Sequence, residues 1–213
     1  MRVLVACEYS GAVRDAFLAR GHEAMSCDFL PTERPGPHYE GDVFDVIDYP
    51  WDLMIAFPPC TDLTVSCSRL WGEKRRDGRQ YAGGAFFMKL IRRAAHIAMW
   101  AIENPVGHMS SAYRRPDQII QPYEFGEDAS KKTCLWLRNL PPLRPTKRVP
   151  GRLVPHPTRP GEMLERWANQ TDSGQNRLTP SDDRWQERAQ TYSGIADAMA
   201  KQWGNLLTLR ATA

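Results

Sequence analysis

The sequence predicts an α/β protein with a Rossmann-like, doubly wound and mostly parallel sheet, followed by a small irregular region near the C-terminus. Three observations lead to this fold class. Short apolar runs alternate with stretches of helical periodicity through the first half of the chain. Residues 51–57 (WDLMIAF) form a nearly continuous apolar run, which is typical of a strand covered on both faces. Residues 140–160 contain seven prolines, which predicts irregular structure there.

The expected elements follow from this periodicity and from the residues that interrupt it. Apolar side chains at helical spacing predict the helices, and Gly21 ends the first of them. In chain order we expect strands at residues 2–6, 22–26, 51–57, 101–103 and 134–137, and helices at residues 12–20, 85–100 and 191–207. The basic, glycine-containing stretch 72–84 predicts a mobile loop, and residues 31–41 are expected to be irregular.

The composition is that of a folded protein. The 213 residues are 42% hydrophobic, which is enough apolar surface for one sizeable core. No run approaches the roughly 18 apolar residues of a membrane span, and Glu8 interrupts the first apolar run too early for a secretion signal, so we expect a cytoplasmic protein. The five cysteines include no Cys-x-x-Cys pair, so we expect neither a disulfide framework nor a metal site.

Positive charge is concentrated in two segments, although the net charge is only +3. Residues 69–93 carry eight Lys and Arg against two acids, and residues 131–159 carry eight with no acid. Such a division predicts a face that binds a polyanion on an otherwise acidic body. Two solvated basic loops remain the alternative.

Polar residues follow four predicted strands. They are Glu8-Tyr9-Ser10-Gly11, Asp28, the PPC motif at residues 58–60 and the ENP motif at residues 103–105. Ligands of an open parallel sheet bind beyond the carboxyl ends of its strands, so Gly11 is placed to admit a cofactor and Asp28 to accept from ribose hydroxyls. Asp42 could accept from an adenine amino group. For each acid alone, a solvated loop or a helix cap is the alternative.

Cys60 and Glu103 are the candidate catalytic pair. Two prolines precede Cys60 and stiffen the turn, so its sulfur is expected at the tip of a strand. Cys7, Cys27 and Cys134 lie in apolar stretches and are interpreted as inert packing. Glu103 ends an apolar strand, where partial burial would favour its protonated form. A nucleophile and a neutral acid could therefore meet over one heterocycle.

The FPPC motif at residues 57–60 resembles the Pro-Cys nucleophile loop of the C5-cytosine DNA methyltransferases, which use S-adenosylmethionine. The ENP motif resembles that family's Glu-Asn motif, and order and spacing match over about the first 137 residues. The resemblance implies a sheet of the class I methyltransferase type. It also implies these cofactor-binding residues: Glu8, Tyr9, Ser10, Gly11, Asp28, Asp42, Phe57 and Pro58. The catalytic residues it implies are Cys60, Glu103, Pro59, Asn104 and Lys132, the lysine standing where the family has an arginine.

The resemblance implies a defined reaction. Cys60 adds to C6 of a cytosine flipped out of duplex DNA, Glu103 protonates N3, and C5 accepts the methyl group before elimination frees the thiol. Contacts to the DNA backbone are expected from Arg69, Lys74, Arg75, Arg76, Arg79 and Lys131. A bacterial or phage origin is expected, with a role in restriction and modification, and a monomer is favoured.

The same resemblance divides the chain into residues 1–139 for catalysis and cofactor binding, a short target-recognition region at 140–190, and a helical region at 191–213 that packs back on the first. Candidates for groove contact in the short region are Trp167, Asn169, Gln170, Gln175, Asn176 and Arg177. A surface wrap over the sheet is the alternative interpretation of this region.

Two other functions stay open at this point. The enzyme could modify a C5 pyrimidine position in RNA or in a free nucleotide. Alternatively, the chain is a catalytically silent nucleic-acid-binding protein on a Rossmann-like scaffold, although such a protein needs neither Cys60 nor Glu103.

Overall fold

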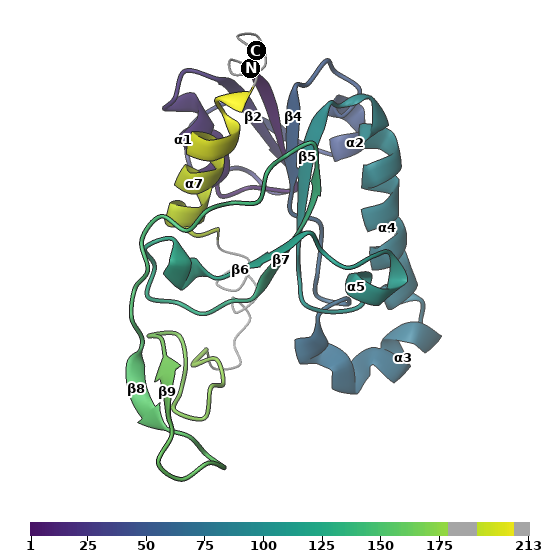
Figure 1. Cartoon of the computed structure of the whole chain (residues 1–213). Coiled ribbons are helices and arrows are strands. Elements are labelled where there is room, and N and C mark those ends of the chain that lie inside the picture. The colour runs from purple at the N-terminus through teal and green to yellow at the C-terminus, as the bar shows by residue number, and fades with distance from the viewer. Residues whose placement is uncertain (179–190, 207–213) are drawn as a thin grey trace.

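The computed structural model describes residues 1–178 and 191–206, in which helices cover both faces of a seven-stranded sheet (Figure 1). The strands of this sheet are β1 (Arg2–Ala6), β2 (Glu23–Asp28), β3 (His38–Glu40), β4 (Leu53–Ala56), β5 (Met99–Pro105), β6 (Gln118–Ile120) and β7 (Thr133–Arg138). The α-helices are α1 (Ala12–Leu18), α2 (Val43–Val46), α3 (Trp71–Arg76), α4 (Arg79–Arg93), α5 (Met109–Ala112) and α7 (Ser193–Trp203). Short 3₁₀ helices are η1 (Val65–Leu70), η2 (Ala94–His96) and η3 (Pro122–Glu124).

Alternate side chains of the strands fill two separate cores. Val3 and Val5 of β1 pack on the face that α1 and α7 cover, whereas Leu4 and Ala6 pack on the face that α2 and α4 cover (Figure 1). All four residues of β4 are buried, because this central strand is covered on both sides. Among the helices of the described residues, none has the length and apolar character that a bilayer crossing requires.

The strand order β3-β2-β1-β4-β5-β7-β6 confirms the predicted Rossmann-like sheet of the class I methyltransferase type. β7 is antiparallel to β5 and β6, while β1 pairs in parallel with β2 and β4, and β4 with β5. The parallel strands therefore end at one edge of the sheet. In Figure 1 the N-terminus lies at the top, so this edge is the lower one.

The prediction of a loop at residues 72–84 was wrong. Residues 71–76 form α3 and α4 begins at Arg79, separated by Gly78 at a φ of 80°. Gly83 allows close packing, because a Cβ there would lie 3.3 Å from the Leu63 side chain, whereas a Cβ at Gly84 would lie at the ordinary contact distance of 3.7 Å from Met109. Helix α4 ends at Arg93, earlier than predicted, and β5 already begins at Met99.

The prediction of irregular structure was also wrong at two places, one in residues 31–41 and one in residues 140–160. Residues 38–40 form β3, and residues 152–155 form β8, which pairs with β9 (Met163–Arg166) in a second, two-stranded sheet. The short strand β6 was not predicted. The predicted C-terminal helix is present as α7, and its predicted end at residue 207 lies outside the described residues, as do residues 179–190.

A buried arginine ties α1 to the segment between β2 and β3. The side chain of Arg14 is 0% exposed, and its guanidinium is paired with Asp15 at 2.8 Å. The same group donates to Ser26 and Thr32 and to the carbonyl of Arg34 at 2.9 Å. These bonds compensate the desolvation of the charge. They also anchor the chain that leads from Asp28 to Asp42.

We expect Arg14→Met to lower the free energy of unfolding by about 2 kcal/mol or more, because several buried acceptors lose a charged donor while the aliphatic stem is kept. The control is Arg20→Met, which removes an exposed arginine just beyond the same helix. Urea unfolding followed by circular dichroism measures both. Equal free energies for the two variants would show that the Arg14 bonds contribute nothing.

Candidate active site

Cys60 lies in a tight turn just beyond the end of β4. The ladder continues one residue past the strand, since the Phe57 amide donates to the Ala6 carbonyl at 2.9 Å. Pro58 is buried, and Cys60 is partly exposed. The Cys60 carbonyl accepts from the amides of Leu63 at 2.9 Å and Thr64 at 3.1 Å. The thiol is thus held at the sheet edge by a turn whose prolines limit backbone freedom.

Glu103 lies on the neighbouring strand at the same level. β4 and β5 are parallel with Ala56 opposite Ile102, so Glu103 comes one residue beyond the paired end of β4. Burial raises the pKa of Glu103, while Lys131 and a hydrogen bond from Thr133 act in the opposite direction. On balance the pKa of Glu103 is raised above its usual value, which is the direction a proton donor requires.

Direct bonds join the turn of Cys60 to the turn after Glu103. Asn104, which is 1% exposed, donates from Nδ2 to the Pro58 carbonyl at 3.3 Å. The Val65 amide donates to the Val106 carbonyl at 2.9 Å, and the His108 amide donates to the Leu63 carbonyl at 2.8 Å. We call these three bonds the turn brace. The brace holds the turn that contains Cys60 against the turn that follows Glu103, so the predicted nucleophile and the predicted acid belong to segments that meet at one edge of the sheet.

Lys131 is the basic side chain that lowers the pKa of Glu103 electrostatically, and the catalytic role expected for Lys132 stays a prediction. Lys132, the residue before β7, is exposed. Thr133 contacts Glu103 and was missed by sequence analysis. Its position opposite Pro105 in the β5–β7 pair depends on an antiparallel register that the sequence did not reveal.

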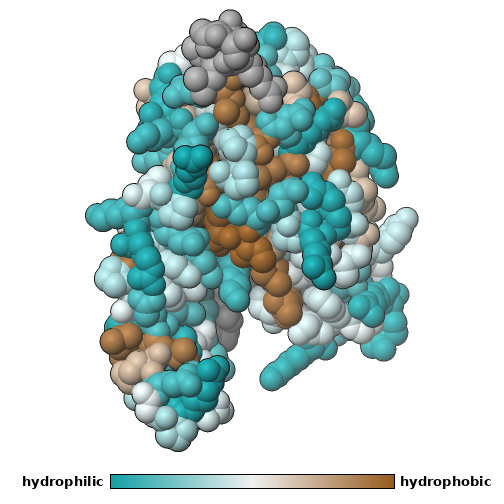
Figure 2. All heavy atoms as spheres, viewed as in Figure 1, coloured by the Kyte–Doolittle hydropathy of each residue, from teal (hydrophilic) through white to brown (hydrophobic). Residues whose placement is uncertain are grey.

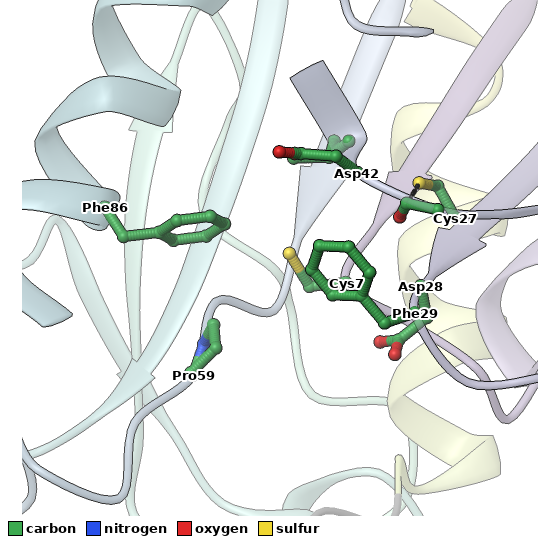
Figure 3. Close-up of a pocket in the computed structure, with 9 residues that line it drawn as sticks. Cys7, Cys27, Asp28, Phe29, Asp42, Pro59 and Phe86 are labelled. Atoms are coloured by element: carbon green, nitrogen blue, oxygen red, sulfur yellow. Dashed lines mark hydrogen bonds between the residues drawn. The ribbon is translucent and has the colours of Figure 1, made fainter. Parts of the chain in front are cut away.

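A hollow of about 110 Å³ opens beside the Cys60 turn, and the close-up in Figure 3 shows its lining. Asp28 follows β2 and Asp42 caps α2, and the rings of Phe29 and Phe86 enter from different sides around the Cys7 sulfur. Pro59 contributes to the wall, so the hollow and the Cys60 turn share a residue. Sequence analysis missed the two phenylalanines and Cys7, whose places depend on how α4 and the residue 29–37 segment pack.

Three other thiols, those of Cys7, Cys27 and Cys134, are poor nucleophiles where they lie. Burial raises the pKa of Cys7 far above its usual value, raises that of Cys27 to about 12, and raises that of Cys134 to about 11. Nearby acids add to the effect at each position. Cys7 also holds a left-handed backbone conformation, with a φ of 57°, at the end of β1. These groups are therefore neutral packing residues near pH 7.

In the loop that follows β1, polar side chains bond to the loop itself and to the start of α1. Glu8 is 3% exposed, and its Oε1 accepts from the Val13 amide at 3.0 Å and from the Ser10 hydroxyl at 2.8 Å. A Cβ at Gly11 would lie 2.5 Å from the Arg14 guanidinium, so this glycine makes room for the arginine. Glu8, Tyr9, Ser10, Gly11, Phe57 and Pro58 do not line the hollow, whereas Asp28 and Asp42 do.

The hollow fits the adenosine part of S-adenosylmethionine. Each acid uses one oxygen locally, Asp28 for the Leu30 amide and Asp42 for the Phe44 amide, and each carboxylate has a second oxygen that can accept from a ligand. Two aromatic rings suit a planar base. Asp28 and Asp42 would hold the sugar and the base if the cofactor binds there, and this role stays a prediction for both. Within the part of the chain that the structure describes, no group of three or more His, Cys, Asp or Glu side chains is placed to hold a metal ion.

Much of the predicted basic surface is neutralised by pairing. Lys74 is 3% exposed and pairs with Asp62 at 2.8 Å, so its prediction as a phosphate contact was wrong. Arg79 pairs with Glu73 and Asp77, and Arg75 donates to Gln80 at 2.9 Å and lies over the Trp71 ring. Arg69 and Arg76 are exposed and form no ion pair among the described residues. Arg75 keeps its charge as well, because Gln80 is neutral, so Arg69, Arg75 and Arg76 remain available to a polyanion.

The β8–β9 lobe projects below the main sheet, and Figure 2 shows a notch between this lobe and the part of the molecule that carries α3. The carboxyl ends of the parallel strands face the notch (Figure 1). The lobe pairs its own charges, Arg148 with Glu165, Arg152 with Asp172 and Arg159 with Glu162.

Trp167, predicted to contact a groove, is instead 8% exposed. It stacks on Tyr123 with ring centroids 3.8 Å apart, which anchors the lobe to the segment around η3. The predicted groove residue Asn169 also serves the anchor, since its side chain donates to the Ser130 carbonyl and accepts from the Ser130 amide, both at 2.9 Å.

No protein-family model and no curated protein matches this sequence. Among solved structures, the chain is similar to EhMeth, a methyltransferase of Entamoeba histolytica, with 12% identity and a TM-score of 0.49. The match covers 70% of this chain and 58% of that chain. At this identity the likeness concerns the fold alone.

We expect Gly107→Ala to break the turn brace, because a Cβ there would lie 2.0 Å from the Leu63 carbonyl oxygen. The matched control is Gly72→Ala, where a Cβ meets no atom within 4 Å. Alkylation of the folded variants by a bulky maleimide, read at Cys60 by peptide mass spectrometry, should change in rate for the first variant and not for the second. An unchanged rate in both would mean that the brace does not position Cys60.

Proposed function

We propose that the protein is a methyltransferase that uses S-adenosylmethionine to methylate C5 of cytosine in DNA through a covalent bond between Cys60 and C6. The turn brace supports this proposal, because it joins the turn of a partly exposed thiol to the strand end that carries Glu103, a carboxyl group whose pKa is raised by burial. A binding protein has no use for that pair. The adjoining hollow, with its two acids and two aromatic rings, supports the choice of cofactor.

The chemistry assigns a separate task to each side chain. C5 of cytosine is a weak nucleophile until the aromatic ring is broken, and the Cys60 thiolate breaks it by forming a bond to C6. Glu103 gives its proton to N3 in the same step, so the electron pair that enters the ring is held at C5. S-adenosylmethionine, when bound, supplies an electrophilic methyl group. A water molecule acting as a base then takes the C5 proton, which restores the double bond and expels the Cys60 thiolate, and N3 returns its proton to Glu103.

Asn104 is a positioning residue in this scheme. Its Nδ2 donates to the Pro58 carbonyl, and its Oδ1 has no partner among the described residues. The bond fixes the first proline of the turn and with it the direction of the Cys60 side chain. An angular error of this turn would move the sulfur away from the carbon that it attacks.

A duplex is the proposed substrate because the notch and the exposed arginines lie on the side of the sheet edge. The target base lies inside a stack in B-DNA, so it reaches Cys60 only when it is flipped out, at a cost of a few kcal/mol. Phosphate contacts by exposed cations such as Arg69 and Arg76 would compensate part of this cost.

We expect a duplex that contains 5-fluorocytosine to form a stable adduct with the wild-type protein and S-adenosylmethionine, because fluorine at C5 blocks the elimination step. Cys60→Ser should form no adduct, and Glu103→Gln should form it about 10²- to 10⁴-fold more slowly. Denaturing gels with labelled DNA measure the adduct. Parallel reactions with RNA and with dCMP identify the substrate, and methyl transfer by Cys60→Ser would overturn the covalent mechanism.

We expect the double variant Arg69→Ala/Arg76→Ala to bind duplex DNA more weakly and to reduce the slope of log K against log salt by about 0.9 for each lost phosphate contact. Arg20→Ala is the control, since Arg20 follows α1 at the opposite edge of the sheet. Fluorescence anisotropy between low and moderate salt gives both slopes. An unchanged slope in the double variant would place the DNA elsewhere.

A further inference from the structure

The segment between β2 and β3 carries part of the wall of the hollow. Asp28 ends β2 and lines the hollow, and Phe29 follows it as the next lining residue (Figure 3). The Leu30 amide donates to Asp28 Oδ1 at 3.0 Å, so the place of Leu30 bears on the direction of the carboxylate. Phe29 is 69% exposed and Leu30 is 37% exposed, so packing holds them weakly. This part of the wall therefore depends on hydrogen bonds.

His38 supplies such a bond from the neighbouring strand. It is the first residue of β3 and lies opposite Ser26 of β2. Its Nε2 lies 2.9 Å from the Leu30 carbonyl oxygen, and its Nδ1 lies 2.8 Å from the Ser26 hydroxyl oxygen. Ser26 is 0% exposed, and its hydroxyl oxygen also lies 3.2 Å from Nη1 of Arg14. One chain of hydrogen bonds therefore leads from the buried guanidinium to the wall of the hollow.

The partners in this chain determine which atoms carry the protons. A carbonyl oxygen only accepts, so Nε2 of His38 carries a hydrogen and donates to Leu30. A guanidinium only donates, so the Ser26 oxygen accepts from Arg14, and the one hydroxyl proton is left for Nδ1 of His38. His38 is then neutral, with its proton on Nε2. A proton on both ring nitrogens would place a second positive charge close to Arg14.

We infer that His38, as the Nε2–H tautomer, is a positioning residue that fixes the direction of the Asp28 carboxylate through Leu30. Its imidazole holds the Leu30 carbonyl, and the Leu30 amide holds Asp28 Oδ1. The second carboxylate oxygen is then presented to a ligand in one orientation, which raises affinity because less freedom is lost on binding. This inference rests on the proposed function for the ligand, which is the ribose of S-adenosylmethionine.

Arg14 anchors the other half of the same segment directly. Its guanidinium donates to Thr32 Oγ1 at 3.1 Å and to the Arg34 carbonyl at 2.9 Å. The half next to β2 is joined to the same guanidinium through Ser26 and His38. One buried cation therefore orients both halves, and polarisation along the chain strengthens each bond in it.

The first test reads the tautomer and needs no cofactor. ¹⁵N NMR of protein labelled at histidine distinguishes a protonated ring nitrogen from an unprotonated one, and His38→Gln assigns the signals. In mildly alkaline buffer we expect a protonated Nε2 and a hydrogen-bonded, unprotonated Nδ1. Ser26→Ala should shift the Nδ1 signal toward that of a free imidazole nitrogen. A proton on Nδ1 of the wild type would overturn the inference.

Two variants separate the two ring nitrogens. The amide nitrogen of His38→Gln can replace Nε2 as the donor to Leu30, whereas His38→Asn keeps an acceptor near Nδ1 and loses that donor. We expect amide hydrogen exchange at Leu30 to be about 10-fold faster in His38→Asn and close to wild type in His38→Gln. The Phe44 amide, which bonds to Asp42 in the same way, is the internal control. Thermal unfolding checks that both variants fold, and unchanged exchange at Leu30 in His38→Asn would contradict the inference.

Calorimetry with S-adenosylhomocysteine tests the link to the hollow. We expect Kd to rise about 5- to 10-fold in His38→Asn and to change less in His38→Gln. In an Asp28→Ala background, His38→Asn should have little further effect, because a residue that acts through Asp28 then has no carboxylate to position. An unchanged Kd in His38→Asn, or additive losses in the double variant, would overturn the inference and leave the proposed function standing. A wild type that binds no S-adenosylhomocysteine, with exchange at Leu30 still responding to His38→Asn, would overturn the proposed cofactor and leave His38 as the residue that orients Asp28.

Discussion

The turn brace is the constraint on which the rest of the site depends. Strands β4 and β5 bring the turns that follow them to the same edge of the sheet. The backbone hydrogen bonds between the two strands end there, so they do not fix the conformation of those turns. Those turns are fixed by main-chain bonds between Val65 and Val106 and between His108 and Leu63, and by one buried amide side chain, that of Asn104. Gly107 allows the two turns to lie this close together, because a Cβ at this position would clash with the Leu63 carbonyl oxygen.

Sequence patterns predicted the parts of the fold that depend on local periodicity. The apolar run of β4, the helix face of α4 and the alternation of strands and helices were sufficient for the fold class, and the carboxyl ends of the strands were sufficient to place Cys60 and Glu103 at one edge. Short elements were missed. β3 and β6 have three residues each, and their backbone bonds come from neighbours distant in sequence.

The site was predicted less well than the fold, for an electrostatic reason. The sequence shows the sign of a charged side chain but not the residue with which it pairs. Lys74 was therefore interpreted as a surface cation, whereas the structure places Asp62 2.8 Å from it. Glu8 resembled a ligand for a cofactor, yet its carboxylate accepts from the Val13 amide at the N-terminus of α1. Lys131 and Lys132 are adjacent in sequence but differ in exposure, since Lys131 is partly buried and Lys132 is exposed.

Ion pairs within the protein also reduce the number of cations that can bind a polyanion. The β8–β9 lobe is rich in arginine, but Glu165, Asp172 and Glu162 lie within bonding distance of three of its guanidinium groups. These pairs lie at the surface, where each contributes at most about 1 kcal/mol to stability. If a duplex binds through the notch as proposed, binding would depend on the cations that form no ion pair and on shape, and we would then expect many DNA sequences to be tolerated, because phosphate contacts position a duplex without reading its bases.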